Sequence, residues 1–366
     1  MERMWRIPSG CAVFGLLNQD GRRISGETIV RAIAVMHERS NGLGGGFVGY
    51  GIYPDFAELY AFHVLYDDPH RRTELEECLK KHFVLEAKEV LPVRKTKAIP
   101  AHPLFVRYFL RPRGVWEDEE DRVVRIVMDI NAHFPGAYII SSGKNMGIFK
   151  GVGYPEDIGE LFRLEEYEGY CWIAHGRFPT NTPGWWGGAH PFGLLSFAVV
   201  HNGEISSYGI NRRYLENFGY YCTLQTDTEV IVYLVDLLVR KHRIPVEWLG
   251  AIFASPFWEH IDAFEEPRRT FFRALRVTYG GALLNGPFSI IVGFPGGMFG
   301  MVDRIKLRPM VAAWKKETLY LSSEESAIRA IEPDPDRVVA LRAGEVIVGR
   351  VGEKVVYGQE LAVSRV

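Results

Sequence analysis

Cys11 is the residue with the clearest chemical potential, because it begins an apolar stretch after a polar decapeptide that ends in Ser9-Gly10. If the Gly10–Cys11 bond is cut, Cys11 gains a free α-amine. Such an amine titrates at about 8 and can take the thiol proton directly or through a water. The alternative is a small buried hydrophobic residue, as most isolated cysteines are. The sequence therefore predicts a nucleophile and its base in one residue, with residues 1–10 removed as a propeptide.

Arg177 is a second candidate and stands in the segment G-R-F-P-T-N-T (176–182), directly after a predicted strand at 170–175. An arginine at the end of a strand can hold a carboxylate, because two of its N–H groups match the two oxygens. An ordinary surface salt bridge is the alternative. We expect Arg177 to bind a substrate carboxylate if the other candidate residues surround it.

A third signal, His201-Asn202-Gly203-Glu204, closes another predicted strand at 196–201. The side-chain amide of Asn202 and the backbone N–H of Gly203 are two donors that can face one developing oxyanion. Donors held in place in this way supply much of the rate in acyl transfer. An Asn-Gly turn without a chemical role is the alternative.

The sequence T-D-T-E-V at 226–230 begins the clearest helix of the chain, predicted at 227–242. Thr226 and Glu229 have the spacing of a capping box, so Asp227 fits the acidic first turn that the helix dipole favours. Asp227 can also direct its carboxylate at a cationic group. Both interpretations are compatible, because a cap would fix the position of that carboxylate.

Together these four signals describe a site for a zwitterion that also carries a carbonyl group. Arg177 would hold an α-carboxylate and Asp227 an α-ammonium group, while Asn202 and Gly203 would stabilise the oxyanion formed when Cys11 attacks. L-glutamine has all of these groups. The sequence therefore predicts a glutamine-hydrolysing site.

Composition favours a folded enzyme rather than a binder of nucleic acids or membranes. Hydrophobic residues make up 47% of the 366 residues, and 43 basic against 45 acidic residues give a formal charge of -2. Nucleic-acid and membrane-surface proteins usually show a basic excess, which is missing here. The four cysteines contain no C-x-x-C pair, so this chain is expected to hold no metal or iron–sulfur cluster. Scattered, unpaired cysteines fit the reducing cytoplasm.

Two observations argue against export and membrane insertion. The N-terminal residues lack the apolar stretch of a secretory signal. The apolar run at 287–302 is interrupted by glycines and a proline, so it predicts two short strands around a turn. We therefore expect a cytoplasmic protein with no membrane partner.

The order of predicted elements indicates mixed sheets packed together and flanked by helices. Strands are expected near both ends of the chain, and a helix is expected around 29–36. The segment at about 68–164 is charged and weakly patterned, which predicts an insertion of helices and loops. The glycine-rich stretch at 39–46 could serve as a closing lid or could equally allow close strand packing.

These residues resemble the class II glutamine amidotransferases, which are N-terminal-nucleophile hydrolases. Cys11 to Gly15 match the start of the mature chain in that family, and the segment 176–180 matches its carboxylate-binding motif. The resemblance also assigns the oxyanion pair to Asn202 and Gly203 and the ammonium-binding acid to Asp227. Thr180 would add a hydrogen bond to the substrate carboxylate.

Further similarity lies in the C-terminal half. D-R-I-K-L-R-P at 303–309 resembles a D-R-x-G-L-R-P segment, and S-S-E-E-S at 322–326 resembles an (A/S)-S-E turn. Three positions depart from the family pattern. Only Arg39 and a displaced glycine correspond to its H-R-G motif, Lys306 replaces a glycine, and Asn181 stands where some relatives have histidine.

The resemblance implies a four-layer αββα sandwich, of class α+β, formed by a single domain at 11–366 with the insertion at 68–164. It also implies hydrolysis of L-glutamine to glutamate and ammonia through a Cys11 thioester. The nearest subtype is the stand-alone amidotransferase subunit of archaeal-type glutamate synthase. This chain would need no cofactor, whereas FMN and an iron–sulfur cluster would belong to a separate ammonia-accepting synthase subunit. An amidase with another acyl substrate or acceptor, or a non-catalytic regulatory subunit, are the alternatives.

Overall fold

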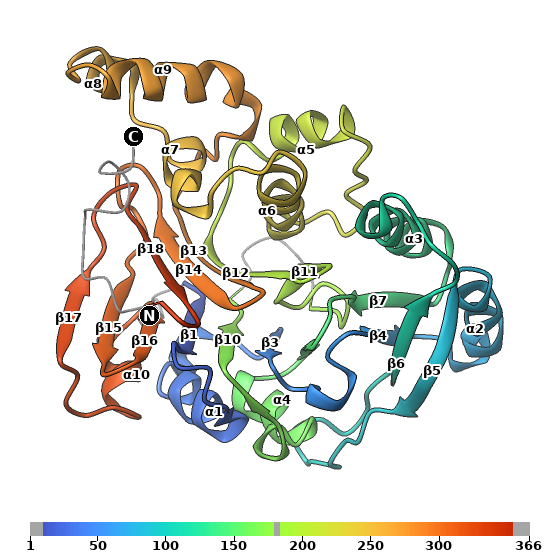
Figure 1. The fold of residues 1–366 in the computed structure, drawn as a ribbon. Coiled ribbons are helices and arrows are strands. Elements are labelled where there is room, and N and C mark those ends of the chain that lie inside the picture. Colours follow the sequence, from blue (N-terminus) through green and yellow to red (C-terminus); the bar gives the residue numbers. More distant parts are fainter. Residues whose placement is uncertain (1–9, 179–183, 354–366) are drawn as a thin grey trace, which may run out of the picture.

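Two antiparallel sheets packed face to face form the centre of the protein, with helices on both outer faces (Figure 1). The computed structural model describes residues 10–178 and 184–353. The larger sheet has seven strands, in the order β17 (Arg337–Ala340), β15 (Val311–Lys315), β16 (Thr318–Ser322), β1 (Ala12–Asn18), β10 (Cys171–Gly176), β3 (Gly45–Tyr50) and β8 (Met146–Gly151). The second sheet has five, in the order β11 (Phe192–Leu194), β12 (Phe197–Gly203), β13 (Phe288–Phe294), β14 (Gly297–Val302) and β18 (Val346–Arg350).

Strand β1 shows why the two sheets pack as a sandwich. Its side chains alternate between two cores, as a period of two requires. Val13 and Leu17 face the core between the sheets, while Phe14 and Leu16 face the outer helices. Because both faces are buried, the strand is apolar from Ala12 to Leu17, and only its last residue, Asn18, is polar. Gly15 fits this close packing, since a Cβ there would lie 3.1 Å from a side-chain atom of Ile291 in the opposite sheet.

Helices complete the two outer layers. Ile29 and Ile33 of α1 (Gly26–Ala34) pack on the seven-stranded sheet, together with α4 (Pro155–Leu161) and α10 (Glu325–Arg329). The five-stranded sheet is covered by α5 (Tyr208–Glu216), α6 (Asp227–Val235) and α7 (Leu249–Phe253). The expected α+β, αββα sandwich is therefore confirmed. Helices α8 (Trp258–Asp262) and α9 (Arg268–Thr278) stand beyond α7, at the upper left of Figure 1.

The inserted segment is a small α/β unit and not only helices and loops, which corrects the prediction. It forms a four-stranded antiparallel sheet in the order β5 (Phe83–Val90), β6 (Leu104–Pro112), β4 (Tyr60–Tyr66) and β7 (Ala137–Ser141). Helices α2 (Arg72–Lys80) and α3 (Glu119–His133) pack on it. Strand β5 is largely exposed at the sheet edge, so its charged residues concealed the strand pattern. Strand β4 already belongs to this unit, whereas β8 and α4, within the predicted insertion, belong to the sandwich.

The long helix predicted at 227–242 is divided. It is α-helical to Val235 and continues as a π-helix over Asp236–Lys241. The buried Asp236 accepts hydrogen bonds from Tyr220 and Arg240 at this point. The strand hairpin predicted at 287–302 is confirmed as β13 and β14. A two-stranded ladder joins β2 (Ile24–Ser25) and β9 (Glu168–Gly169). Within the described ranges, no helix combines the length and the apolar character that a membrane span requires.

Candidate active site

Cys11 directly precedes β1, which lies between β16 and β10 in the seven-stranded sheet. Its Sγ atom accepts a hydrogen bond from the backbone N–H of Phe178 at 3.3 Å. Burial raises the pKa of the Cys11 thiol, although this N–H and the charges of Arg177 and Arg308 act in the opposite direction. While Gly10 remains attached, the thiol is therefore protonated at neutral pH and needs a base to become a nucleophile.

The backbone at Cys11 is held by two residues from distant segments. Arg39 donates from Nε and Nη2 to the carbonyl oxygen of Cys11, at 3.3 and 3.2 Å. Glu324 in turn accepts from Nη1 of Arg39 at 2.9 Å. The hydroxyl of Ser323 accepts a hydrogen bond from the N–H of Val13 at 3.0 Å. Arg39 thus holds the backbone of Cys11, while the S-S-E segment holds Arg39 and the backbone of Val13. The sequence did not reveal these roles.

Asp303 organises a loop beside Cys11. It is buried, and its carboxylate accepts hydrogen bonds from the backbone N–H groups of Phe288, Ile305, Leu307 and Arg308. The loop brings Arg308 close to the nucleophile. Nη1 of Arg308 lies 3.5 Å from the position that a Cβ atom on Gly10 would take. The D-R-I-K-L-R-P segment is therefore a positioned loop at the site.

Asn202 and Gly203 end β12 on the same side of the molecule as Cys11. Asn202 is fully buried, yet neither atom of its side-chain amide has a hydrogen-bond partner among the described residues. Its Oδ1 atom lies 3.8 Å from the Cβ position of Gly10, so the amide faces the Gly10–Cys11 junction. A buried amide without a partner is costly, which points to a bound group that completes it. Gly203 has φ of +148°, and a Cβ there would lie 1.9 Å from the carbonyl oxygen of Pro287.

Asp227 begins α6, and its carboxylate is held from three sides. Oδ2 accepts from the N–H of Ile205 at 2.9 Å, while Oδ1 lies 3.3 Å from the Thr228 hydroxyl and 3.5 Å from Nδ1 of His201. Burial works against ionisation, but His201 and these hydrogen bonds hold the pKa of Asp227 below its usual value. The carboxylate is therefore charged at neutral pH. Thr226 caps the helix by accepting from Thr228 N–H at 3.4 Å, as predicted.

Glu229 does not complete the predicted capping box. Its carboxylate accepts instead from the backbone N–H groups of Thr223 and Leu224, at 3.0 and 2.9 Å. This chain segment turns back in front of the helix, so its N–H groups reach Glu229. The correction concerns only the cap, because Asp227 keeps its position at the helix start.

Arg177 follows β10 directly and is 6% exposed. Burial lowers its pKa from the usual value, while Cys11 in its thiolate form and the Asp227 carboxylate raise it. Its guanidinium therefore lies within the electrostatic reach of both groups. The Arg177 carbonyl also accepts from Asn41 N–H and from the Ser40 hydroxyl, each at 3.2 Å. Cys11, Arg177, Asn202 and Asp227 thus converge, as the sequence predicted, whereas Thr180 lies outside the described residues.

The sequence did not predict the buried group of polar residues that lies behind Asp227. Nε2 of His190 lies 2.7 Å from the Thr228 hydroxyl, and the rings of His175 and His190 stack at 4.3 Å. Nε2 of His175 contacts the carbonyl oxygen of His201 at 2.9 Å. Burial lowers the pKa of His175 to about 3, so its ring stays neutral. His201 in the H-N-G-E segment was the available signal, but the sequence pattern suggested roles only for Asn202 and Gly203.

The glycine-rich stretch at 39–46 serves mainly close packing in its second half. Gly45 and Gly46 belong to β3, and a Cβ on Gly46 would lie 2.5 Å from the carbonyl oxygens of His190 and Phe149. A hinge role is therefore restricted to the residues before β3. Whether these residues close over a substrate remains a prediction.

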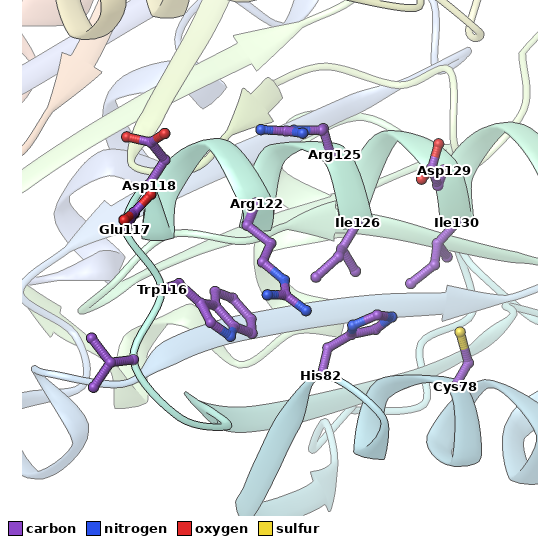
Figure 2. A pocket seen from close by; sticks show the side chains of 11 residues that line it. Cys78, His82, Trp116, Glu117, Asp118, Arg122, Arg125, Ile126, Asp129 and Ile130 are labelled. Carbon is purple, nitrogen blue, oxygen red and sulfur yellow. The ribbon is translucent and has the colours of Figure 1, made fainter.

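Figure 2 shows a separate pocket of about 520 Å³ in the inserted unit, between α3 and the end of α2. Arg122 reaches from α3 toward Trp116, with its guanidinium carbon 4.3 Å from the ring centre. None of the predicted site residues lines this pocket. No cluster of three or more metal-binding side chains occurs in the described part of the chain.

Comparison with known proteins identifies the family. The sequence profile described as "Glutamine amidotransferases class-II" matches residues 120–361, which is more than half of the chain. The chain belongs to the class II glutamine amidotransferases. The matched range of this class II amidotransferase contains Arg177, Asn202, Gly203 and Asp227 but begins after Cys11, so the nucleophile rests on the geometry.

Several archaeal proteins are similar to this amidotransferase. An uncharacterised protein of Archaeoglobus fulgidus is 52% identical over 347 residues, covering 93% of this chain and 92% of that one. A protein of Methanothermobacter thermautotrophicus, provisionally named a glutamine amidotransferase, is 25% identical over 341 residues. The match covers 92% of this chain and 98% of that one. The amidophosphoribosyltransferase of Methanocaldococcus jannaschii is 26% identical over 217 residues, covering 57% of this chain and 40% of that one.

Among solved structures, the glutamine PRPP amidotransferase of B. subtilis overlaps 93% of this chain and 49% of its own, at 14% identity and a TM-score of 0.44. A superposition this loose supports no statement about the site.

Proposed function

We propose that this amidotransferase hydrolyses L-glutamine to glutamate and ammonia through a thioester on Cys11, after loss of residues 1–10. The observation that carries the proposal is that two fixed, opposite charges both act on the thiol. Arg177 lowers and Asp227 raises the pKa of Cys11, so both lie within electrostatic reach of Sγ. An α-amino acid has a carboxylate and an ammonium group that complement this pair of charges.

Removal of residues 1–10 supplies the base that the buried thiol lacks. In the intact chain the nitrogen of Cys11 is an amide and cannot accept the proton. After cleavage the new α-amine lies on the same residue, and Arg39 still holds the Cys11 carbonyl oxygen. The cleavage is proposed to be autocatalytic, with Asn202 beside the bond that is broken.

The reaction then follows from the positions of the donors. The Cys11 thiolate attacks the side-chain amide carbon of glutamine, and the carbonyl oxygen becomes an oxyanion. The Asn202 amide and the Gly203 N–H stabilise that oxyanion. The amide nitrogen of this intermediate receives a proton from the Cys11 ammonium group, the carbon–nitrogen bond breaks and ammonia leaves. Water then hydrolyses the thioester to release glutamate and the thiol.

The ammonia acceptor is proposed to lie on a separate synthase subunit, with glutamate synthase as the first candidate. This choice rests on the resemblance to the stand-alone amidotransferase subunit of archaeal-type glutamate synthase, whereas the segments at 303–309 and 322–326 support only the class II family. FMN and an iron–sulfur cluster would belong to that subunit. Co-purification of the native complex followed by mass spectrometry of its chains would identify the acceptor.

Substrate analogues test the glutaminase proposal against a more general amidase. L-glutamine would be compared with one analogue that lacks only the α-amine and one that lacks only the α-carboxylate. The proposal predicts a large rise in KM for each analogue, because Asp227 or Arg177 loses its partner. Equal hydrolysis of all three amides would overturn the glutamine assignment and favour another amidase.

A further inference from the structure

A cleft of about 680 Å³ lies between helices α7 to α9 and the segment at 342–348 that leads into β18. Figure 1 shows these helices gathered at one end of the five-stranded sheet, on the opposite side from α1 and α4. The volume of the cleft falls within the roughly 300–1,000 Å³ that is usual for small-molecule sites. The cleft contains none of the residues assigned to glutamine.

Aromatic side chains form much of the cleft wall. Trp248 and Phe271 meet edge to face at 4.8 Å, and Phe264 and Phe272 meet at 5.2 Å. Phe257 lies at the rim and is 38% exposed. A surface of this kind favours a flat apolar body, which it can remove from water.

The charged residues at the cleft are mainly arginines. Arg268, Arg304 and Arg342 line it, and none of them forms an ion pair with a carboxylate of the described residues. Two of them lie over aromatic rings: Arg268 is 4.1 Å from the ring centre of Phe264, and Arg304 is 4.3 Å from that of Phe257.

The two carboxylates in the wall are already engaged. Glu247 pairs with Arg350 at 2.5 Å, and Glu345 accepts from the backbone N–H of Arg342 at 2.6 Å. Arg350 balances the charge of Glu247, whereas the backbone N–H leaves the charge of Glu345 in place. Three arginines therefore face one carboxylate without a cationic partner, and the cleft keeps an excess of positive charge. Burial and then the charge of Arg304 lower the pKa of the nearby Arg276, which shows how closely these cations lie.

We propose that this cleft binds an organic anion with a flat, apolar body, such as an aromatic carboxylate, phosphate or sulfonate. The aromatic wall holds the body, while Arg304 and Arg342 hold the anionic group at the end of the cleft where their segments meet. Those segments are joined by a hydrogen bond from Gly344 N–H to the Asp303 carbonyl oxygen at 3.0 Å.

The cleft is connected to the nucleophile through Asp303. This residue precedes Arg304, and its carboxylate also holds the backbone of Arg308, which lies beside Gly10. A ligand that moves Arg304 therefore acts on the loop beside Cys11. This regulatory effect rests on the proposed glutaminase function, whereas binding to the cleft does not.

Binding is tested with anilinonaphthalene sulfonate, a fluorescent aromatic anion, titrated into the full chain. Ala343 is exposed at the cleft rim, so its replacement removes no contact of the fold. Ala343→Glu should weaken binding about two- to fivefold at low salt, as one added like charge at an exposed site does. Ala343→Lys should bind at least as tightly as wild type.

The matched control is Ala274→Glu, at an exposed position of α9 that does not line the cleft. It should bind the probe as wild type does. Equal affinity in Ala343→Glu and Ala274→Glu, or equal affinity for the uncharged anilinonaphthalene, would overturn the proposal. If Ala343→Glu weakens binding while no variant hydrolyses glutamine, the cleft proposal stands and the proposed function fails.

Discussion

The guanidinium of Arg39 donates two hydrogen bonds to the carbonyl oxygen of Cys11, at 3.3 and 3.2 Å, while Glu324 holds its third nitrogen at 2.9 Å. The three residues come from the position just before β1, the short helix after α1 and the turn before α10. Their arrangement fixes the peptide of the proposed nucleophile. Arg39 and Glu324 belong to two segments that only partly match family motifs, and the structure joins them in one contact.

Loss of the contact between Glu324 and Arg39 should slow the reaction without weakening substrate binding. Glu324→Gln should lower kcat by up to about a hundredfold, because small displacements of a nucleophile can cost that much. KM should change little, since Glu324 does not contact the amino-acid charges. The control is Glu325→Gln, which removes only the exposed ion pair with Arg329. A raised KM with unchanged kcat would contradict a positioning role.

Asn202→Ala should lower kcat by about 10²- to 10³-fold, as loss of one oxyanion donor does in other acyl-transfer enzymes. The fold should persist, because the amide has no partner to lose among the described residues. Steady-state glutaminase kinetics and a thermal melt measure the two effects. Asn217→Ala, at an exposed position after α5, provides the control. Normal turnover in the Asn202 variant would remove this residue from the mechanism.

Asp227→Asn should raise KM for glutamine strongly, because the replacement removes the charge that the α-ammonium group would meet. The pKa of Asp227 is lower than usual, so the wild-type carboxylate stays ionised as pH falls from 8 to about 5. Over this range the Asp227 contribution to KM should be constant. A wild-type KM that rises in step with protonation of a carboxylate between those values would contradict the assignment.

Lys150 gives a prediction for stability against pH. It is buried, and burial lowers its pKa from 10.5 to about 7. Below pH 7 both the folded and the unfolded chain carry its proton, and the folded state bears the full cost of the buried charge. Between these two pKa values the unfolded chain binds more protons, so stability rises with pH. The Lys150→Met variant should lose this rise when the free energy of urea unfolding is measured from pH 7 to 9. An unchanged slope of that free energy against pH would contradict the prediction.

Gly203→Ala should prevent correct folding or abolish activity. A Cβ at this position would lie 1.9 Å from the Pro287 carbonyl oxygen, in a backbone conformation of φ +148° that side chains avoid. Gly280→Ala is the control, because nothing lies within 4 Å of its Cβ position. Soluble yield and circular dichroism would separate the two variants. Equal behaviour would mean that the backbone at Gly203 differs from the one described.

The sequence pattern predicted individual strands of the two sheets where burial leaves a simple pattern, whereas the αββα layer order came from the family resemblance. Strand β1 is apolar from Ala12 to Leu17 because both of its faces are covered, and β13 with β14 is marked by the glycines of its turn. Strand β5 was missed because half of its residues are exposed, among them its three charged ones. Its pairing with β6 depends on contacts between distant residues, which local patterns do not encode.

The same distinction applies to the site. Cys11, Arg177, Asn202 and Asp227 could be predicted because each ends or begins an element and carries a reactive or charged group. The contact of Arg39 with Cys11 could not, since it joins segments that only the folded sheets bring together. The three partners of Asp227 likewise come from different elements, and no spacing in the sequence connects His201 with Thr228.

The most direct test of the central claim is the intact mass of the purified protein after incubation with a diazoketone analogue of glutamine. The account predicts a chain that begins at Cys11 and carries one adduct on that residue. Excess L-glutamine should prevent the adduct, and the Cys11→Ala variant should carry none. An active chain that retains residues 1–10, or an adduct on Cys78, Cys171 or Cys222, would contradict the account.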